Sequence, residues 1–297
     1  MRITVFTTTY NRAYTLTNLY ESLRQQTFHD FEWLIIDDGS DDDTEDLVGC
    51  WMKEDHPFEI RYYRFDNAGK QKEINRGLNL AEGELFFNVD SDDTVVPDAL
   101  ALIDRWEKDL PKDGTFCGVA GNSAYADGHF DSPLFEKGYQ DSTLFARLPE
   151  MCTDCQHIGF DRAWVFYTKV HRKYLYPEFE NEKFIPEAVV WNRMANKGLQ
   201  IRSFNDIICS FTQLSDGYTS RISQTLIRNP HGYGLWKAEQ MTFLHYSFFR
   251  RIREYYVFYC DLTGSHTVRE ISGYIHCPVL LMKCISLIYK VRHRRTA

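Results

Sequence analysis

The first hundred residues alternate short β-rich runs with helical patterns, and this alternation limits the fold more than any other feature. Between the runs, apolar residues recur at helical spacing, as at Leu16, Leu19 and Leu23. Strands separated by helices indicate βαβ units, so we predict an α/β domain around a mostly parallel central sheet with helices on both faces. Right-handed crossovers would align the C-terminal strand ends along one edge. The predicted strands cover residues 3–6, 31–36, 59–64 and 85–89.

After Asp109 the alternation weakens. We predict two further strands, at residues 116–120 and 163–168, because these runs are apolar and rich in β-forming residues. The stretch from 122 to 149 is rich in Gly, Asp and Pro and is predicted to form loops. Apolar residues on one face of 186–196 predict a helix there.

Polar clusters follow three of the predicted strands. They are Thr8 to Asn11, Asp37-Asp38, and Asp90 to Asp93. Open α/β sheets bind ligands at the carboxyl edge where these clusters should meet. The acids of the last cluster repel one another, and a divalent cation such as Mg²⁺ or Mn²⁺ would remove that conflict. The alternative is a solvated acidic turn that caps the helix after Pro97.

Charge and composition exclude some classes of protein. The chain has 34 Lys and Arg against 42 Asp and Glu, a net charge of −8, which argues against a nucleic-acid-binding protein. A hydrophobic content of 43% argues against disorder. Only Cys152 and Cys155 are closely spaced, so reduced thiols are expected. The start Met1 to Val5 leads directly into a strand pattern rather than a signal peptide. These features predict a cytoplasmic protein.

Three segments resemble the family 2 glycosyltransferases, which have a GT-A fold. They are Thr8-Thr9-Tyr10-Asn11-Arg12, Ile36-Asp37-Asp38-Gly39-Ser40, and Asn67 to Asp93, which ends in a D-x-D motif. One departure is Glu73, where the family usually has a small residue. The resemblance implies a hexosyltransferase that moves sugar from a UDP-sugar to a glycan or lipid-linked acceptor, with Mn²⁺ or Mg²⁺ as cofactor. It also implies a role in bacterial surface polysaccharide synthesis.

The resemblance also assigns site residues. Asp92 would bind the metal, and Asp90 would contact the ribose or join the metal site. Asp38 would meet the uracil: its motif alone would indicate an ordinary turn, but its register with the other motifs favours nucleotide contact. Arg12 and Lys70 could equally be surface charges. The residues expected to bind the nucleotide sugar are Thr8, Thr9, Tyr10, Asn11, Arg12, Asp38, Lys70, Asn75, Asp90 and Ser91.

A catalytic base is expected at the start of the helix near residue 186. Phe184 to Arg193 resembles the family's E-D-x-x-L-W-x-R segment, which aligns Glu187 with the family's catalytic Asp and Pro186 with the preceding Glu. Glu187 would take the proton from the acceptor hydroxyl, and a single displacement implies inversion. The alternatives are a first-turn acid favoured by the helix dipole, or a base supplied by Glu178, Glu180 or Glu182.

From residue 216 the sequence becomes aromatic, basic and helical in pattern. We therefore predict a main domain over residues 1–220 and a C-terminal helical extension over residues 221–297. The apolar run from Cys277 to Tyr289 is shorter than the ~20 residues of a spanning helix, and a basic tail follows it. It predicts either a helix lying on the inner face of an anionic membrane or a final helix docked on the protein.

Two other functions are weaker on the sequence. A sugar-1-phosphate nucleotidyltransferase would need a Gly-rich loop after the first strand, and Thr7 to Thr17 contains no Gly. An inactive module that binds nucleotide sugars or glycans would not need Asp90, Asp92 and Glu187 together.

Overall fold

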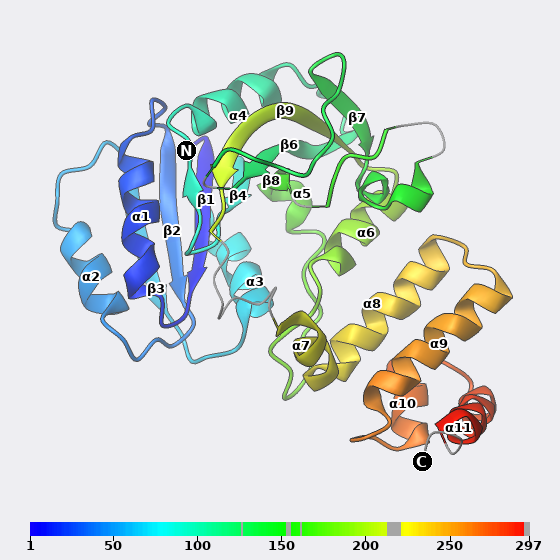
Figure 1. Ribbon diagram of the computed structural model, residues 1–297. Coiled ribbons are helices and arrows are strands. Elements are labelled where there is room, and N and C mark those ends of the chain that lie inside the picture. The colour runs from blue at the N-terminus through cyan, green and yellow to red at the C-terminus, as the bar shows by residue number, and fades with distance from the viewer. Residues whose placement is uncertain (126, 153–155, 161, 213–220, 294–297) are drawn as a thin grey trace. The chain divides into compact units, whose positions relative to one another are not determined.

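The computed structural model describes residues 1–125, 127–152, 156–160, 162–212 and 221–293. It contains a nine-stranded sheet, in the order β3-β2-β1-β4-β8-β6-β9-β5, with β7 also paired to β9 (Figure 1). The strands are β1 Ile3–Thr9, β2 Phe31–Asp37, β3 Glu59–Arg64, β4 Leu85–Asn88, β5 Thr94–Val95, β6 Phe116–Ala124, β7 Tyr139–Thr143, β8 Arg162–Tyr167 and β9 Gln200–Ser210.

The first four strands are parallel, as the alternation predicts. Beyond β4 the sheet is mixed, because β8 runs antiparallel to both β4 and β6. The prediction of a mostly parallel sheet therefore holds for the β3-β2-β1-β4 half. The other half departs from it because its connections are not single crossover helices.

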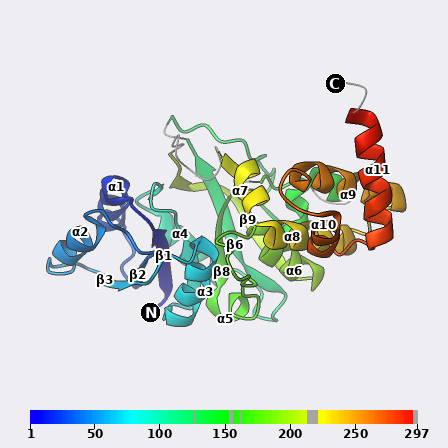
Figure 2. The same cartoon turned by 90° about the horizontal axis from the view of Figure 1, so that it is seen from below.

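Helices cover both faces of the sheet, as predicted. Ile3 and Val5 pack with α1, α2 and α4 in the main apolar cluster, whereas Phe6 points the other way and stacks on Phe86, with ring centroids 4.9 Å apart. α3 covers this second face, so that α1 and α3 lie on opposite sides of β1 (Figure 2). The helices are α1 Ala13–Arg24, α2 Thr44–Trp51, α3 Lys70–Leu80, α4 Ala99–Lys108, α5 Thr168–His171 and α6 Ala188–Asn196.

Two sequence predictions for the middle of the chain fail. The predicted loop region contains β7 and the 3-10 helices Leu144–Arg147 and Pro149–Met151. β7 reads Tyr-Gln-Asp-Ser-Thr, and its largely exposed edge position requires no apolar alternation. β9, the longest strand, was not predicted, because its pairing with β6 contains register shifts that break a regular pattern.

The chain divides into two compact units. The first contains Met1–Leu175 and Arg193–Ser215, and the second contains Tyr176–Asn192 and Asp216–Ala297. The predicted boundary at residue 220 falls outside the described residues. The C-terminal extension is helical, as predicted: α7 Ile222–Arg228, α8 Pro230–Phe243, α9 Phe248–Leu262, α10 Val268–Tyr274 and α11 Val279–His293.

The sequence predicts reduced cysteines and a last helix too short to span a membrane, and the described residues bear on both predictions. None of the cysteines described there forms a disulfide, and Cys155 lies outside it. No helix in the same residues has the length and apolar character needed to cross a bilayer.

Gly39 shapes the turn after β2. Its φ is +81°, and a Cβ at this position would lie 3.0 Å from the backbone nitrogen of Asn67 and 3.1 Å from the carbonyl oxygen of Phe65. Both the left-handed backbone and the close approach therefore favour glycine.

Gly39→Ala is expected to lower the free energy of unfolding by about 1–3 kcal/mol, the usual cost of a non-glycine residue held in a sparsely populated backbone region. Urea unfolding measures the change. Gly49→Ala in α2 is the matched control, because nothing lies within 4 Å of the added methyl group and alanine favours the helix. Equal stability of the two variants would contradict the role given to Gly39.

Candidate active site

The carboxyl ends of β1, β2 and β4 meet at one edge of the sheet. Thr9 pairs with Asp37, and the backbone N–H of Asp38 donates to the carbonyl oxygen of Thr9 at 2.9 Å. On the other side of β1, the backbone N–H of Val89 donates to the carbonyl oxygen of Phe6 at 2.9 Å. The structure therefore brings the three polar clusters together in the first unit.

Two cations lie beside the acids that follow β4. The Lys70 ammonium, at the start of α3, is 2.8 Å from a carboxylate oxygen of Asp90. The Arg12 guanidinium, in the loop after β1, is 3.9 Å from an oxygen of Asp92. Both residues were predicted to lie at the nucleotide site, and here they share one edge with the acids.

The acids themselves are crowded. Burial and then the negative charge of Asp90 raise the pKa of Asp92. Burial, with the charges of Asp90 and Asp92, raises the pKa of Asp93 to about 8. A solvated acidic turn would not show such shifts, because water would screen and hydrate each carboxylate. The arrangement therefore favours a site built to receive positive charge.

These residues fit a divalent cation that is shared with a ligand. In the described residues no three His, Cys, Asp or Glu side chains are grouped so that they could hold an ion by themselves. Mg²⁺ is commonly bound by one or two carboxylates together with substrate phosphates and water. Asp92 and Asp90 supply such carboxylates, and the repulsion that raises the pKa of Asp92 would be relieved by the ion.

The Asp37-Asp38 turn is held by internal hydrogen bonds. The buried carboxylate of Asp37 accepts from the backbone N–H of Ser40 at 2.8 Å and from the Tyr62 hydroxyl at 2.6 Å. The Asp38 carboxylate accepts from the backbone N–H groups of Ala68 and Gly69, at 2.5 and 2.9 Å, just before α3. Asp38 thus fixes the loop beside the predicted nucleotide site, and its contact with a nucleobase stays a prediction.

The loop after β1 is tied to the same turn. Asn11 has a φ of +52°, its backbone N–H donates to the Ser40 hydroxyl, and its side-chain oxygen accepts from the backbone N–H of Asp41, both at 2.8 Å. Asn11 therefore positions the neighbouring Tyr10 and Arg12, and its amide oxygen is already bonded within the protein.

Two buried polar atoms at this edge lack a hydrogen-bond partner within the described residues. They are the hydroxyl oxygen of Thr9 and the side-chain oxygen of Asn88. Each sits at the end of a central strand, where a bound ligand could satisfy it. Thr9 was predicted from the sequence. Asn88 was not, although a polar residue closing an apolar strand was a visible signal.

The other predicted nucleotide residues differ in exposure. Tyr10 is 47% exposed, and Thr8 is half-buried. Asn75 and Ser91 are buried, at 6% and 7% exposure, on α3 and in the acidic turn respectively. Their direct contact with a ligand remains a prediction.

Glu187 belongs to the second unit and immediately precedes α6. Its carbonyl oxygen accepts from the backbone N–H groups of Val190 and Trp191, so it occupies the first turn of the helix and is half-buried. Among the competing acids, Glu182 is buried and accepts from the backbone N–H groups of His231 and Gly232, at 2.7 and 2.9 Å. Glu182 therefore caps α8, and the role of Glu187 as the base stays a prediction.

The sequence profile described as Glycosyl transferase family 2 matches residues 4–165. This match covers more than half of the chain and includes both the acidic turn and Lys70. The chain belongs to glycosyltransferase family 2.

Named relatives agree with this assignment. The glycosyltransferase is 30% identical over 139 residues to a putative glycosyltransferase, EpsH, of Bacillus subtilis, covering 47% of this chain and 39% of EpsH. It is 33% identical over 104 residues to the GalNAc(5)-diNAcBac-PP-undecaprenol beta-1,3-glucosyltransferase of Campylobacter jejuni, covering 34% of this chain and 33% of that enzyme. The chain therefore matches about two-fifths or less of the length of these relatives.

Solved structures share the fold of the glycosyltransferase. S. aureus TarS 1-349 in complex with UDP-GlcNAc superposes with a TM-score of 0.62 at 15% identity, covering 98% of this chain and 92% of the TarS chain. The mannosyltransferase PcManGT of Pyrobaculum calidifontis, in complex with GDP-Man and Mn²⁺, gives 0.53 at 15% identity, covering 96% and 86%. These likenesses confirm the predicted GT-A fold.

Glu73 places a second carboxyl group beside that of Asp38, near the loop that precedes α3. It is fully buried in α3, where one side-chain oxygen accepts from Arg76 at 2.5 Å and the other is buried without a donor within the described residues. Burial, opposed by Arg76 and reinforced by the Asp38 carboxyl beside it, raises the pKa of Glu73 to about 7. Glu73 and Asp38 thus form a pair of neighbouring carboxyl groups beside the start of α3.

The stability of the glycosyltransferase is therefore expected to fall as the pH rises from about 4.5 to about 7. In this range Glu73 is protonated in the folded protein and ionised in the unfolded chain. The folded protein therefore binds more protons than the unfolded chain, and the free energy of unfolding decreases as the pH rises. The effect is at most about 3–4 kcal/mol, at about 1.4 kcal/mol per pKa unit over the shift from 4.5 to about 7. Melting temperatures between pH 5 and pH 8, in the wild type and Glu73→Gln, measure it.

Glu73→Gln should remove this part of the pH dependence, because the amide stays neutral beside Asp38. Glu59→Gln is the control, since Glu59 is exposed and its replacement should leave the wild-type profile unchanged. Parallel profiles for the wild type and Glu73→Gln would show that Glu73 does not titrate in this range.

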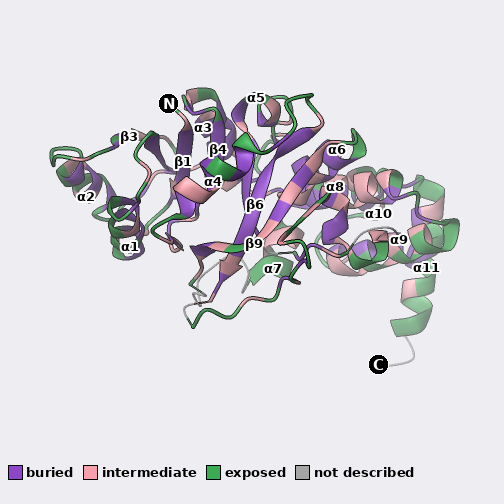
Figure 3. Cartoon of the chain, turned by 90° about the horizontal axis from the view of Figure 1, so that it is seen from above, coloured by how far each residue is buried: buried purple, intermediate pink, exposed green. Residues whose placement is uncertain are grey.

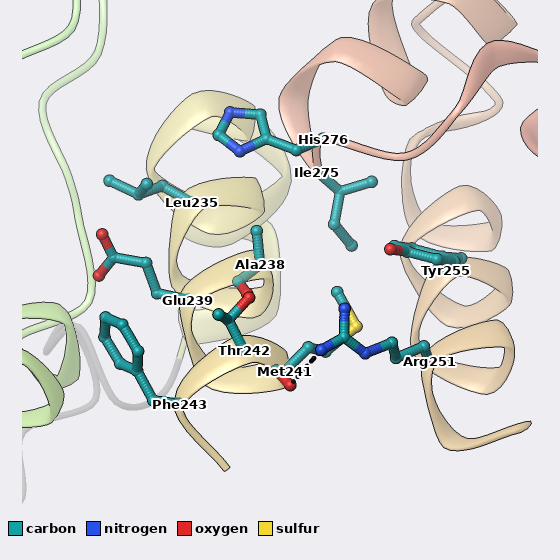
Figure 4. A pocket seen from close by; sticks show the side chains of 10 residues that line it. All are labelled: Leu235, Ala238, Glu239, Met241, Thr242, Phe243, Arg251, Tyr255, Ile275 and His276. Atoms are coloured by element: carbon teal, nitrogen blue, oxygen red, sulfur yellow. Dashed lines mark hydrogen bonds between the residues drawn. The ribbon is translucent and has the colours of Figure 1, made fainter. Parts of the chain in front are cut away.

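A separate cavity lies within the second unit of the glycosyltransferase. It has a volume of about 300 Å³ and is lined by side chains of α8 and α9 and of the segment after α10, including Met241, Tyr255 and His276 (Figure 4). The Arg251 guanidinium at its wall donates to the carbonyl oxygens of Met241 and Tyr246, both at 3.1 Å. The Arg251 guanidinium is thus already hydrogen-bonded to backbone carbonyl groups. None of the predicted site residues lines the cavity.

Proposed function

We propose that this glycosyltransferase moves a sugar from a UDP-sugar to a hydroxyl group of a glycan or lipid-linked acceptor, with inversion and with Mn²⁺ or Mg²⁺ as cofactor. The setting proposed for it is the cytoplasmic side of bacterial surface polysaccharide synthesis. The observation that carries the proposal is the pairing of Lys70 and Arg12 with the acids Asp90 and Asp92 at the carboxyl edge of the parallel strands.

The charges of this edge suit a nucleoside diphosphate. Lys70 and Arg12 can each turn from a carboxylate toward a phosphate oxygen, since both side chains are long and carry several donors. Asp92, with Asp90, would hold the cation, which when bound supplies positive charge that stabilises the departing diphosphate. The unsatisfied oxygens of Thr9 and Asn88 would meet donors of the nucleoside.

The UDP preference is supported by TarS, whose structures contain UDP-GlcNAc and UDP. The lipid-linked acceptor is supported by the Campylobacter jejuni relative, whose name specifies an undecaprenol-linked acceptor. Glu187 would accept the proton of the attacking hydroxyl, and one base acting in one displacement gives an inverted product.

Removal of divalent cations is expected to abolish turnover. In an assay of UDP release from a panel of UDP-sugars, EDTA should bring the rate to background, and excess Mn²⁺ or Mg²⁺ should restore it, because the diphosphate would otherwise leave without charge stabilisation. Excess Ca²⁺ tests whether any divalent ion suffices. Full turnover in EDTA, or turnover with GDP-sugars alone, would overturn the proposed metal or donor respectively.

A further inference from the structure

The last helix presents an apolar stripe to solvent. On α11 the side chains of Leu280, Leu287, Ile288 and Val291 are exposed by 76%, 64%, 48% and 53%. Their spacing of three, four and seven residues places them on one face of the helix. Figure 3 shows the last turns of α11 as exposed. Large apolar side chains gathered on one exposed face mark a contact surface.

The opposite face of α11 is fixed by the helical unit. Met282 and Ile285 are buried, at 0% and 1% exposure. The Ser286 and Tyr259 hydroxyl groups are 2.8 Å apart, and the ring of Tyr289 packs edge-on against Tyr259. These contacts fix the orientation of α11 about its own axis against α9. The apolar stripe therefore faces solvent.

Charge identifies what the stripe contacts. Lys283 lies on the same face as Leu280 and Leu287, and Lys290 and Arg292 occupy the last turn of α11. The sequence from Ile271 to Ala297 contains no Asp or Glu, although the whole chain has a net charge of −8. A second copy of the stripe would bring like charges together, which opposes self-association. An anionic lipid surface matches both the apolar stripe and its basic border.

We propose that α11 is an interfacial helix that docks the enzyme on an anionic bilayer. Leu280, Leu287, Ile288 and Val291 enter the boundary between headgroups and acyl chains, and Lys283 and Lys290 contact the lipid phosphates. Docking does not depend on the donor or the metal, so failure of this proposal and failure of the proposed reaction are measured separately.

Co-sedimentation of the full chain with lipid vesicles tests the proposal. The protein should bind vesicles of phosphatidylcholine mixed with phosphatidylglycerol, bind those of phosphatidylcholine alone much less, and dissociate as salt is raised. Leu280→Ser/Leu287→Ser should weaken binding at least about tenfold. Lys283→Gln/Lys290→Gln should weaken binding to the anionic vesicles selectively.

Leu134→Ser is the matched control, because Leu134 is 59% exposed in the first unit and should not affect sedimentation. All the variants replace exposed residues, so melting temperature and UDP release in solution should stay at wild-type values. Lack of binding to anionic vesicles would overturn the proposal, and so would unchanged binding of the double-leucine variant. A stripe variant that converts an oligomer into a monomer in gel filtration, without any vesicle binding in the wild type, would assign the stripe to a second copy instead.

Discussion

Asp92→Asn is expected to lower UDP release by at least about 10²–10³-fold, the loss seen when one preorganised electrostatic contact to a transition state is removed. The asparagine keeps the shape of the side chain and loses the charge that is proposed to hold a cation beside the diphosphate. The fold should not suffer, because burial and Asp90 already disfavour the charged form of Asp92. Steady-state rates at saturating Mn²⁺ and a melting curve measure both effects.

Asp66→Asn is the comparison for this variant. Asp66 is an exposed acid in the loop between β3 and α3, so its replacement removes one negative charge from the same unit without touching the acidic turn. Near-normal turnover is expected. If Asp92→Asn retained comparable turnover, Asp92 would not be a metal ligand.

Glu187→Gln is expected to reduce turnover about 10²–10⁴-fold, the contribution of a positioned general base. The donor should bind as before, since the proposed nucleotide contacts all lie in the first unit. The loss should therefore appear in kcat, with the KM for the UDP-sugar nearly unchanged. Measurement of kcat and KM with a glycan or lipid-linked acceptor tests this.

Glu180→Gln gives the control for the base. Glu180 is exposed in the same segment, and its replacement should leave kcat at the wild-type value. An equal loss in both variants would point to a disturbed segment rather than a missing base. Equal slow UDP release in the wild type and Glu187→Gln would instead favour a module that binds nucleotide sugars without turning them over.

The parallel half of the sheet was predictable because its signals are local. Runs such as Leu85 to Phe87 are apolar and end in polar residues, so both the strand and the edge it reaches can be read from the chain. β9 could not be predicted, because Asn205 and Asp206 interrupt its pattern and its pairing with β6 is irregular. β7 gives no apolar signal at all, since it is a polar edge strand.

The candidate site was predictable to a similar degree. Convergence of strand ends was enough to predict that the clusters Thr8 to Asn11, Asp37-Asp38 and Asp90 to Asp93 share one edge, because topology determines that edge. Arg12 and Lys70 were assigned to it only through the family resemblance. The sequence did not show that Asp38 holds the loop before α3, or that Glu73 is buried against it. Both facts depend on side-chain packing between segments about 30 residues apart, and one sequence carries no direct record of such contacts.

The path of the chain makes the C-terminal helices necessary for the segment that carries Glu187. Residues 176–192 belong with α7 to α11: Glu182 binds the first turn of α8, the side-chain oxygen of Asn229 accepts from the backbone N–H of Lys183, and Gly232 packs against Phe184. A protein shortened to residue 215 would keep the acids proposed to bind the metal, but it would lack the helices that contact the segment of the candidate base. The C-terminal helices therefore support the segment of the proposed base, and truncation would separate it from the proposed nucleotide site.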